Sequence, residues 1–565
     1  MNEKPWLAHY DEGIPATAAP YSGTLLDKLD EAVRQRPDAA AVWFKGTTLS
    51  WGQMDELSNQ FANALIAMGV KKGEPVSSLL VNSPQAVIAQ LGCWKVGAVY
   101  APLNPLYTER ELEELLNTSG ARVMLVLTPF YARVKAIQAK TKLEYVIPTR
   151  IREYLPFVLR LLFIALREKK AGHQVTPATG DHYLPELLAA QVGKPRPNVP
   201  ITPDDDALLL GTGGTTGIPK VAIGTHGGLL AAGKQIRTWF KDALVDWDSY
   251  FCLPLPLFHV FGNGGALSTS LYGHFPLALV PDPRDVKDLA ETIGKTKPAF
   301  FIGVPTLYIA LLNNPEVKEG KIDFRSMKAC ISGAAPLLAE TKMAFEKLTG
   351  GRIVEGYSLT EAMMACCINP YKGEFKLGSV GMPVPDMTVR IADGVTGEGS
   401  LPTGEVGEII LQAPQIMKGY WGRPDATAEM IQMHDGERWL HTGDLGYLDE
   451  DGYVFIVDRK KDLIKPSGYQ VWPREVEEVL SQHPAVQEAA VAGIPDAYKG
   501  EAVAAWIVLK AGMVATVDEI RAFCKERMAA YKVPTRIEFR DTLPKTMVGK
   551  VLRRSLVEEY KQKNK

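Results

Sequence analysis

Hydrophobic residues recur with two different periods along the chain, and the two periods alternate. Apolar positions spaced three to four residues apart predict amphipathic helices, and short apolar runs predict buried strands. Helices are predicted at residues 25–36, 51–68 and 337–348, and strands at residues 75–81, 122–127, 299–303 and 329–332. Strands that alternate with helices indicate an α/β fold, here with two doubly wound parallel sheets in the large N-terminal part.

The pattern changes after Gly378, where short strands are interrupted by Gly and Pro. This texture predicts a small β-barrel-like subdomain. The last hundred residues predict a small α+β domain, with a helix that begins at Pro473 and a second helix capped by Thr516 and Glu519. The polar run DRKKDLIKPSG at residues 458–468 is the best linker. We therefore divide the chain into residues 1–460 and 461–565.

The segment Tyr154–Leu166 is apolar except for Arg160, and basic residues flank it on both sides. Thirteen helical residues rise only about 20 Å, which is too short for a hydrocarbon core of roughly 30 Å. Two interpretations remain open for this segment. It is either a core or subdomain-interface helix, or an amphipathic helix that lies on a membrane surface.

Composition narrows the class of protein. The 63 basic and 65 acidic side chains nearly balance, so a nucleic-acid partner is not indicated. The six cysteines show no CxxC spacing and the first residues do not resemble a signal peptide, so a cytoplasmic protein with reduced thiols is expected. The last 41 residues carry 12 basic and 5 acidic side chains, a surplus that suits a polyanionic ligand or a solvated basic surface.

The strongest local signal is GTGGTTGIPK at residues 211–220, directly after a predicted strand. Its glycines allow backbone N–H groups to turn inward, its threonines add hydroxyl donors, and Lys220 adds a positive charge, a combination that suits a polyphosphate. A P-loop requires Ser or Thr directly after its lysine, where this chain has Val221. A Walker-type NTPase is therefore disfavoured.

Six further motifs follow in a fixed order, and the whole set resembles the acyl-adenylate-forming enzymes over essentially the entire chain. The seven motifs are GTGGTTGIPK (211–220), PLFHVFG (256–262), SGAAP (332–336), GYSLTE (356–361), WLHTGD (439–444), DRKK (458–461) and PKTMVGK (544–550). The stretch from Trp439 to Lys461 is similar to the signature of fatty-acyl-CoA synthetases, in particular the bacterial long-chain branch. Ser358 and Val221 depart from the family pattern, which usually has Gly at both positions, but neither change removes a ligand-binding side chain.

The resemblance implies a role for each motif residue. Thr212, Gly213, Gly214, Thr215, Thr216, Gly217 and Lys220 would bind the ATP phosphates, Gly333, Ala334, Ala335, Gly356 and Tyr357 the adenine, Asp444 and Arg459 the ribose, and Ser467, Gly468 and Tyr469 the arm of coenzyme A. Thr360 would meet the α-phosphate, Glu361 would hold Mg²⁺, and His259 would lie beside the acyl pocket. Lys550 would be the catalytic cation, and Lys461 the hinge between an adenylating domain and a mobile C-terminal domain.

These residues also fit the chemistry of carboxylate activation. A carboxylate is a poor electrophile, because oxide would have to leave. Attack on the α-phosphate of ATP gives a mixed anhydride from which a thiol displaces AMP. The first step brings two anions together and therefore needs Mg²⁺ and a cation such as Lys550.

We therefore expect an ATP-dependent ligase that converts a medium- or long-chain fatty acid to acyl-AMP and then acyl-CoA. An aryl- or short-chain-acid–CoA ligase is the main alternative, and an inactive scaffold homologue is a weaker one. The expected partners are fatty acid, ATP and CoA. Peripheral contact with the inner face of the cell membrane through Tyr154–Leu166 and a homodimer are left open.

Overall fold

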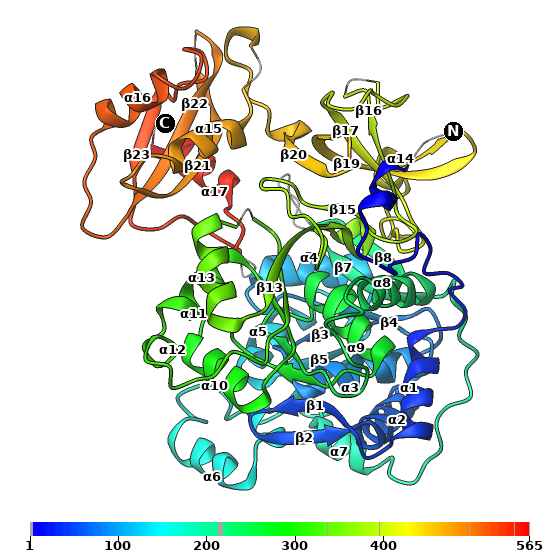
Figure 1. The fold of residues 1–565 in the computed structure, drawn as a ribbon. Coiled ribbons are helices and arrows are strands. Elements are labelled where there is room, and N and C mark those ends of the chain that lie inside the picture. Colours follow the sequence, from blue (N-terminus) through cyan, green and yellow to red (C-terminus); the bar gives the residue numbers. More distant parts are fainter. Residues whose placement is uncertain are drawn as a thin grey trace.

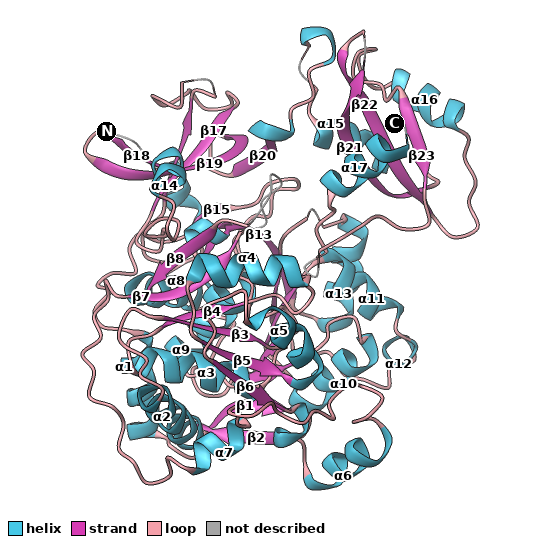
Figure 2. Cartoon of the chain, turned by 180° about the vertical axis from the view of Figure 1, so that it is seen from behind, coloured by secondary structure: helices cyan, strands magenta, loops and turns pink. Residues whose placement is uncertain are grey.

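The computed structural model describes residues 4–212, 219–335, 337–394, 396–469, 471–496, 498–546 and 549–563. Two large sheets with their helices form the body of the molecule (Figure 1). A five-stranded antiparallel subdomain and a separate C-terminal domain lie side by side at one end of this body (Figures 1 and 2). The predicted fold class is confirmed.

The first sheet has six strands in the order β6-β5-β3-β4-β7-β8 and is parallel except for the β7–β8 pair. Its strands are β3 (Pro75–Leu79), β4 (Val99–Pro102), β5 (Val123–Leu127), β6 (Tyr145–Thr149), β7 (Asp206–Gly211) and β8 (Val221–Thr225). The strands predicted at residues 75–81 and 122–127 are thus confirmed. Because β7 and β8 flank residues 211–220, the sheet edge fixes both ends of the glycine-rich loop.

The second sheet has nine strands in the order β15-β14-β13-β12-β11-β9-β10-β1-β2, with a parallel centre and antiparallel edges. Its strands are β1 (Ala40–Phe44), β2 (Thr47–Ser50), β9 (Phe251–Leu253), β10 (Leu277–Leu279), β11 (Phe300–Gly303), β12 (Ala329–Ser332), β13 (Arg352–Leu359), β14 (Met364–Ile368) and β15 (Met382–Pro383). The parallel strands β12 and β13 carry motif residues at their carboxyl ends, where open α/β sheets bind ligands.

Helices connect and cover these strands, and α3 is buried along its whole length. The helices of the body are α1 (Leu25–Gln35), α2 (Trp51–Ala67), α3 (Pro84–Lys95), α4 (Glu109–Ser119), α5 (Tyr131–Gln138), α6 (Phe157–Leu166), α7 (Leu184–Ala189), α8 (His226–Trp239), α9 (Ser268–Gly273), α10 (Val286–Thr296), α11 (Pro305–Asn313), α12 (Pro315–Lys318) and α13 (Ala339–Thr349). A π-helix spans Phe261–Leu267, and short 3-10 helices span Pro5–His9, Thr128–Phe130, Ile151–Tyr154, Thr360–Ala362, Lys460–Asp462 and Pro466–Gly468. No described helix is both long and apolar enough to cross a membrane.

The remaining two units are an antiparallel subdomain and an α+β domain, as the change in pattern after Gly378 predicts. The antiparallel subdomain comprises β16 (Thr388–Ala392), β17 (Gly407–Gln412), α14 (Pro424–Met430), β18 (Ile431–His434), β19 (Glu437–Leu448) and β20 (Val454–Arg459). The C-terminal domain comprises α15 (Pro473–Ser481), β21 (Val486–Asp496), β22 (Gly500–Leu509), α16 (Val517–Lys525), β23 (Arg536–Phe539) and α17 (Arg553–Lys563). It has hydrophobic clusters of its own on both faces of its sheet, and the predicted capping box of Thr516 is present.

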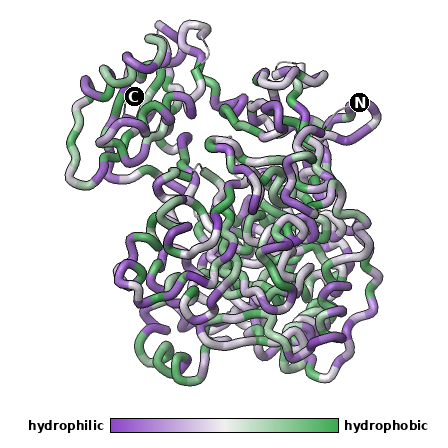
Figure 3. The backbone as a smooth tube through the Cα atoms, in the orientation of Figure 1, coloured by the Kyte–Doolittle hydropathy of each residue, from purple (hydrophilic) through white to green (hydrophobic). Residues whose placement is uncertain are grey.

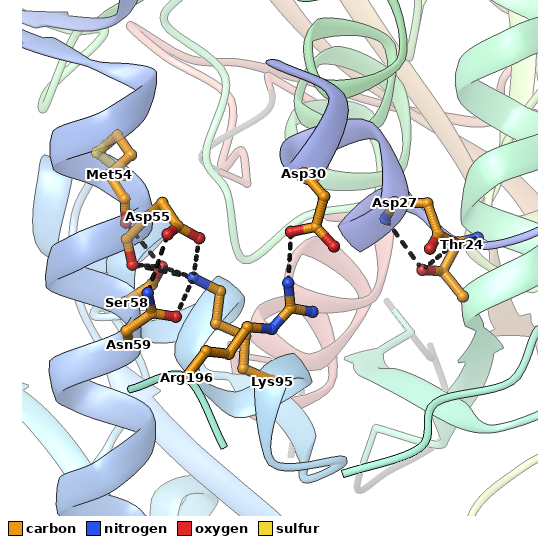
Figure 4. Close-up of polar contacts among 9 residues, drawn as sticks. All are labelled: Thr24, Asp27, Asp30, Met54, Asp55, Ser58, Asn59, Lys95 and Arg196. Atoms are coloured by element: carbon orange, nitrogen blue, oxygen red, sulfur yellow. Dashed lines mark hydrogen bonds and ion pairs between the residues drawn. The ribbon is translucent and has the colours of Figure 1, made fainter. Parts of the chain in front are cut away.

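A buried lysine joins α3 to α2 (Figure 4). The ammonium of Lys95 donates to a side-chain oxygen of Asp55 at 2.6 Å, to Ser58 Oγ at 2.7 Å and to Asn59 Oδ1 at 2.7 Å. Burial lowers the pKa of Lys95 to about 8, although the carboxylate of Asp55 opposes the shift. The cluster fixes the rotation of α3 between the sheets.

The predicted apolar segment that contains helix α6 is not packed into the hydrophobic core. None of its residues is buried, and the side chains of Phe157, Val158 and Leu166 are about two thirds exposed or more. It projects as a hydrophobic coil from the end of the body opposite the C-terminal domain (Figures 1 and 3). The core-helix interpretation of this segment is therefore wrong.

Candidate active site

Three motif residues meet where the second sheet approaches the antiparallel subdomain. Tyr357 on β13 donates from its hydroxyl to Asp444 Oδ2 at 2.5 Å, and Arg459 Nε contacts Asp444 Oδ1 at 3.0 Å. Asp444 and Arg459 face each other directly across the β19–β20 ladder. Burial and the nearby Asp444 raise the pKa of Tyr357, so its hydroxyl remains a donor at neutral pH. The carboxylate is thus held on both oxygens before any ligand arrives.

Four small residues follow β12 or precede Tyr357 on β13. Gly333 follows β12 and packs against Phe261, because a Cβ at Gly333 would come within 3.0 Å of the Phe261 ring. Ala334, which has a φ of 69°, and Ala335 are exposed, and Gly356 precedes Tyr357 on β13. The missing side chains at Gly333 and Gly356 thus accommodate Phe261 and the Cys367 carbonyl, whereas Ala334 and Ala335 present small side chains to solvent.

The base of the glycine-rich loop is closed by a backbone hydrogen bond of 2.7 Å from Thr212 N–H to the Lys220 carbonyl. Lys220 Nζ lies 5.1 Å from the centre of the Tyr420 ring and 3.9 Å from a Glu429 oxygen. The predicted loop residues Gly213, Gly214, Thr215, Thr216 and Gly217 lie outside the described residues. The described end of the loop at Lys220 therefore lies beside Tyr420.

Thr360 and Glu361 form the short 3-10 turn that follows β13. Glu361 Oε1 accepts a hydrogen bond of 2.7 Å from the hydroxyl of Tyr420, whereas Oε2 has no hydrogen bond to any described residue. No set of three or more His, Cys, Asp or Glu side chains that could hold a metal ion occurs in the described part of the chain. The donor set still fits Mg²⁺, which commonly takes one carboxylate together with substrate phosphates.

His259 lies at the entrance to the π-helix, and its carbonyl accepts from the Asn263 N–H. Burial and the positive charge of Lys550 lower the pKa of His259 to about 4, so its imidazole is neutral at pH 7. The amide side chain of Asn263 pairs reciprocally with that of Gln90 on α3, at 2.7 and 2.8 Å. This buried amide pair fixes the π-helix behind His259.

Lys550 sits on a hairpin that the C-terminal domain extends toward the body. The Lys545–Val551 bridge closes the hairpin, and Gly549 packs near Thr306, whose Oγ1 would lie 3.1 Å from an added Cβ. The Lys550 side chain is exposed. Protein around it and the guanidinium of Arg459 nevertheless lower the pKa of its ammonium to about 8. Lys550 thus shares the field of His259, Arg459 and Asp444, three residues of the N-terminal part.

The predicted CoA-binding residues do not contact Lys550 or the described residues around it. They are Ser467, Gly468 and Tyr469. The Ser467 N–H donates to the Lys499 carbonyl, and the ring of Tyr469 stacks on Tyr531 at 4.7 Å. Their recorded contacts are therefore within the C-terminal domain. Lys461 lies between the two groups, in the 3-10 turn after β20.

Sequence reasoning missed Tyr420. It lies in the run QIMKGYW after β17, which carries no phosphate or metal signature, and its partner Glu361 is 59 positions away. Only the fold brings the two residues together, because residues 418–421 pair with β8 beside the phosphate loop.

Comparison with known proteins gives a consistent family. The chain matches the model of the AMP-binding enzyme over residues 29–421 and that of the AMP-binding enzyme C-terminal domain over residues 475–550. A long-chain-fatty-acid–CoA ligase of Bacillus subtilis is 39% identical over 560 residues, which cover 99% of this chain and 98% of the relative. A 4-coumarate–CoA ligase of Petroselinum crispum is 32% identical and covers 90% of this chain and 89% of its own.

Among solved structures, ATP-bound MatB of Rhodopseudomonas palustris superimposes with a TM-score of 0.81 at 28% identity, covering 96% of this chain and all of its own. The apo form of the same protein superimposes with a lower TM-score of 0.70. Over its whole length the structure is thus more similar to the ATP-bound form than to the apo form. This chain belongs to the AMP-binding enzyme family.

Proposed function

We propose that the protein is an AMP-forming fatty-acid–CoA ligase acting on medium- or long-chain acids. The observation that carries the proposal is the near-complete match to the Bacillus subtilis long-chain-fatty-acid–CoA ligase, which exceeds the match to the 4-coumarate–CoA ligase in both identity and coverage. An aryl-acid–CoA ligase is accordingly the second candidate. The meeting of Tyr357, Asp444 and Arg459 supports a nucleotide site in either case.

The residues divide the work between binding and charge stabilisation. Asp444, held by Tyr357 and Arg459, presents acceptors for the ribose hydroxyls, and Gly333–Ala335 and Gly356 leave a surface for adenine. Lys220 and Thr212, with the loop between them, bind the phosphates. Thr360 donates to the α-phosphate, and Lys550 places a positive charge between the acid and that phosphate. Neutral His259 borders the acyl group without adding a charge that an apolar chain would have to desolvate.

Glu361 would hold Mg²⁺ through its unpaired oxygen. The ion, when bound, supplies positive charge that neutralises the phosphate oxygens. Lys220 and Lys550 would supply further positive charge at the phosphates.

The C-terminal domain, residues 461–565, would pivot at Lys461 between the two half-reactions. In the present arrangement Lys550 faces the site and the segment Ser467–Tyr469 does not, which matches an adenylating state. A rotation would withdraw Lys550 and bring Gly468 to the path of the CoA arm, where a missing side chain allows close approach.

The decisive experiment measures AMP and acyl-CoA formation over acetate, octanoate, palmitate, oleate, benzoate and coumarate. AMP, pyrophosphate and acyl-CoA from octanoate, palmitate or oleate are expected. Turnover confined to benzoate or coumarate would establish the second candidate, and ADP as the product would exclude both.

We further propose that α6 contacts the surface of an anionic membrane. Its apolar side chains are exposed, and the nearby Arg160, Arg167, Lys169 and Lys170 are exposed and form no ion pair with a described residue. Arg152, in contrast, is neutralised by Glu168. Burial of the apolar α6 side chains in the membrane interface would contribute to binding, and each nearby Lys or Arg would add about 1 kcal/mol by attraction to anionic lipids. The resulting binding would be weak and sensitive to salt. Because α6 lies opposite the C-terminal domain, such contact would leave the proposed pivot free (Figure 1).

Sedimentation with vesicles rich in phosphatidylglycerol, at low and high salt, tests this surface. Val158→Asp with Leu162→Asp, on one face of α6, should abolish binding, whereas Leu106→Asp with Val192→Asp, exposed elsewhere, should not. Unchanged sedimentation of the α6 variant would reject the proposal. A smaller mass of that variant in solution without any vesicle effect would instead identify α6 as the face of a homodimer.

A further inference from the structure

The segment that carries Tyr420 is built onto the strand that leaves the phosphate loop. Residues 418–421 run antiparallel to β8, with hydrogen bonds from Lys418 N–H to the Ile223 carbonyl, from Ile223 N–H to the Gly419 carbonyl and from Trp421 N–H to the Val221 carbonyl, at 2.8 to 2.9 Å. Ala222 and Tyr420 face each other in this pairing. Since β8 begins directly after Lys220, the place of Tyr420 is fixed relative to the end of the loop.

The same segment also holds Glu361 at two points. The Met417 N–H donates to the Glu361 carbonyl at 2.8 Å, and the Tyr420 hydroxyl donates to Oε1 at 2.7 Å. Tyr420 is 5% exposed, and its own N–H donates to Thr427 Oγ1 at 2.8 Å. The phenol therefore has little freedom, and it passes this restraint to the carboxylate.

The face of the Tyr420 ring supports a second charge. Lys220 Nζ lies 5.1 Å from the ring centre, within the range of a cation–π contact. One aromatic residue thus touches both the loop cation and the candidate metal ligand.

We propose that Tyr420 is a positioning residue that fixes the Glu361 carboxylate, with Oε2 turned toward a divalent cation on the nucleotide, and that supports Lys220 with its ring. The inference rests on the proposed function, because it takes Glu361 as the metal ligand. A carboxylate with both oxygens free would rotate about its terminal torsion and hold a metal–nucleotide complex less firmly.

Binding of ATP to the protein by calorimetry, with and without Mg²⁺, tests the proposal without relying on turnover. Tyr420→Phe keeps the ring and removes only the hydroxyl. It should weaken ATP binding in the presence of Mg²⁺ on the order of tenfold, the usual effect of losing a hydrogen bond to a charged group. Binding of AMP without metal and the melting temperature should change little. Tyr420→Leu removes the ring as well and should weaken ATP binding even without Mg²⁺.

Tyr453→Phe is the matched control, because this buried tyrosine donates at 2.7 Å to the Glu374 carbonyl and has no recorded contact with Glu361. If Tyr420→Phe affects Mg²⁺-dependent ATP binding no more than Tyr453→Phe does, the proposal is wrong. Equal loss of AMP and MgATP binding would assign Tyr420 a merely structural role and would also overturn it. Failure of the proposed ligase function would be recognised separately, as wild-type protein that binds MgATP but forms no acyl-CoA.

Discussion

If Lys550 is the catalytic cation of the proposed ligase, its lowered pKa should make the first half-reaction sensitive to mild alkali. Only the ammonium form can stabilise the developing negative charge at the α-phosphate, and crowding by protein together with Arg459 brings its pKa to about 8. Activity should therefore lie on a plateau below pH 7 and decline as the pH rises through 8. At pH 9, one unit above the pKa, about one tenth of the molecules carry the ammonium, so the rate should fall to about one tenth.

The assay is acyl-AMP formation followed by pyrophosphate release in the absence of CoA, between pH 6.5 and 9.5. The quantity to plot is kcat/KM, because it reports the pKa of Lys550 in the free enzyme. The pH dependence of kcat would report the enzyme with its anionic substrates bound, and these anions would raise the pKa of the ammonium. Lys550→Arg keeps a positive charge with a pKa above about 12, so its profile should stay flat over this range even if the rate is lower. Lys550→Ala should lower the rate on the order of 10²–10³-fold on the plateau below pH 7. The difference should be smaller at pH 9, where most wild-type molecules have lost the ammonium.

Transfer of a supplied acyl-adenylate to CoA is the internal control, because Lys550 has no charge to stabilise there. Its rate should rise with pH as the thiolate of CoA becomes more abundant. An alkaline decline that persists in Lys550→Arg would show that another group titrates. A wild-type profile that is flat to pH 9.5 would refute the lowered pKa.

Three further predictions concern the metal, the hinge and the buried lysine. Glu361→Ala should weaken Mg²⁺-dependent turnover at least tenfold with little change in melting temperature, and a collapse in melting temperature without any Mg²⁺ effect would contradict the metal role. Lys461→Pro, which fixes φ, should retain acyl-AMP formation and lose transfer to CoA; the opposite outcome would move the pivot elsewhere. Lys95→Met should lower the free energy of unfolding by about 3–5 kcal/mol in urea, because Asp55 loses a buried partner, and the exposed Lys347→Met is the control. Because the pKa of Lys95 is lower in the folded state than in the unfolded state, the free energy of unfolding of the wild type should increase relative to that of Lys95→Met as the pH rises from 8 to 10. A difference between the two proteins that becomes smaller over this pH range would contradict the lowered pKa.

Local patterns predicted most of the elements, because the period of burial is set within each helix or strand. The strand predicted at residues 329–332 matches the structure residue for residue, and those predicted at residues 122–127 and 299–303 begin one residue too early. The helix predicted at residues 337–348 instead runs over residues 339–349, since its start depends on how the preceding turn leaves β12. Helix ends are decided by such local contacts, which periodicity does not record.

The environment of an element was harder to predict than its type. The apolar pattern of Tyr154–Leu166 correctly indicated a helix, but an apolar helix is equally compatible with a core and with an exposed surface. Only the packing of the other elements shows that no face of the body covers α6. In the same way, the motif residues were found in sequence, but the contacts of Tyr420 depend on the pairing of residues 418–421 with β8.

The contacts on either side of Lys461 indicate what a rotation of the C-terminal domain would have to break. Arg553 pairs with Asp462 and with Glu477, both on the C-terminal side of the proposed hinge, so these ion pairs would travel with the domain. The hydrogen bond of 2.7 Å from the Arg474 N–H to Asp458 Oδ2 joins the two sides and would be lost. Asp458 also accepts from the Arg459 N–H, which moves with the body, so its carboxylate would keep one partner after the rotation. If the domain pivots at Lys461, the hydrogen bond from Arg474 to Asp458 would be exchanged for contacts with solvent, and binding of nucleotide or CoA would shift the population between the two states.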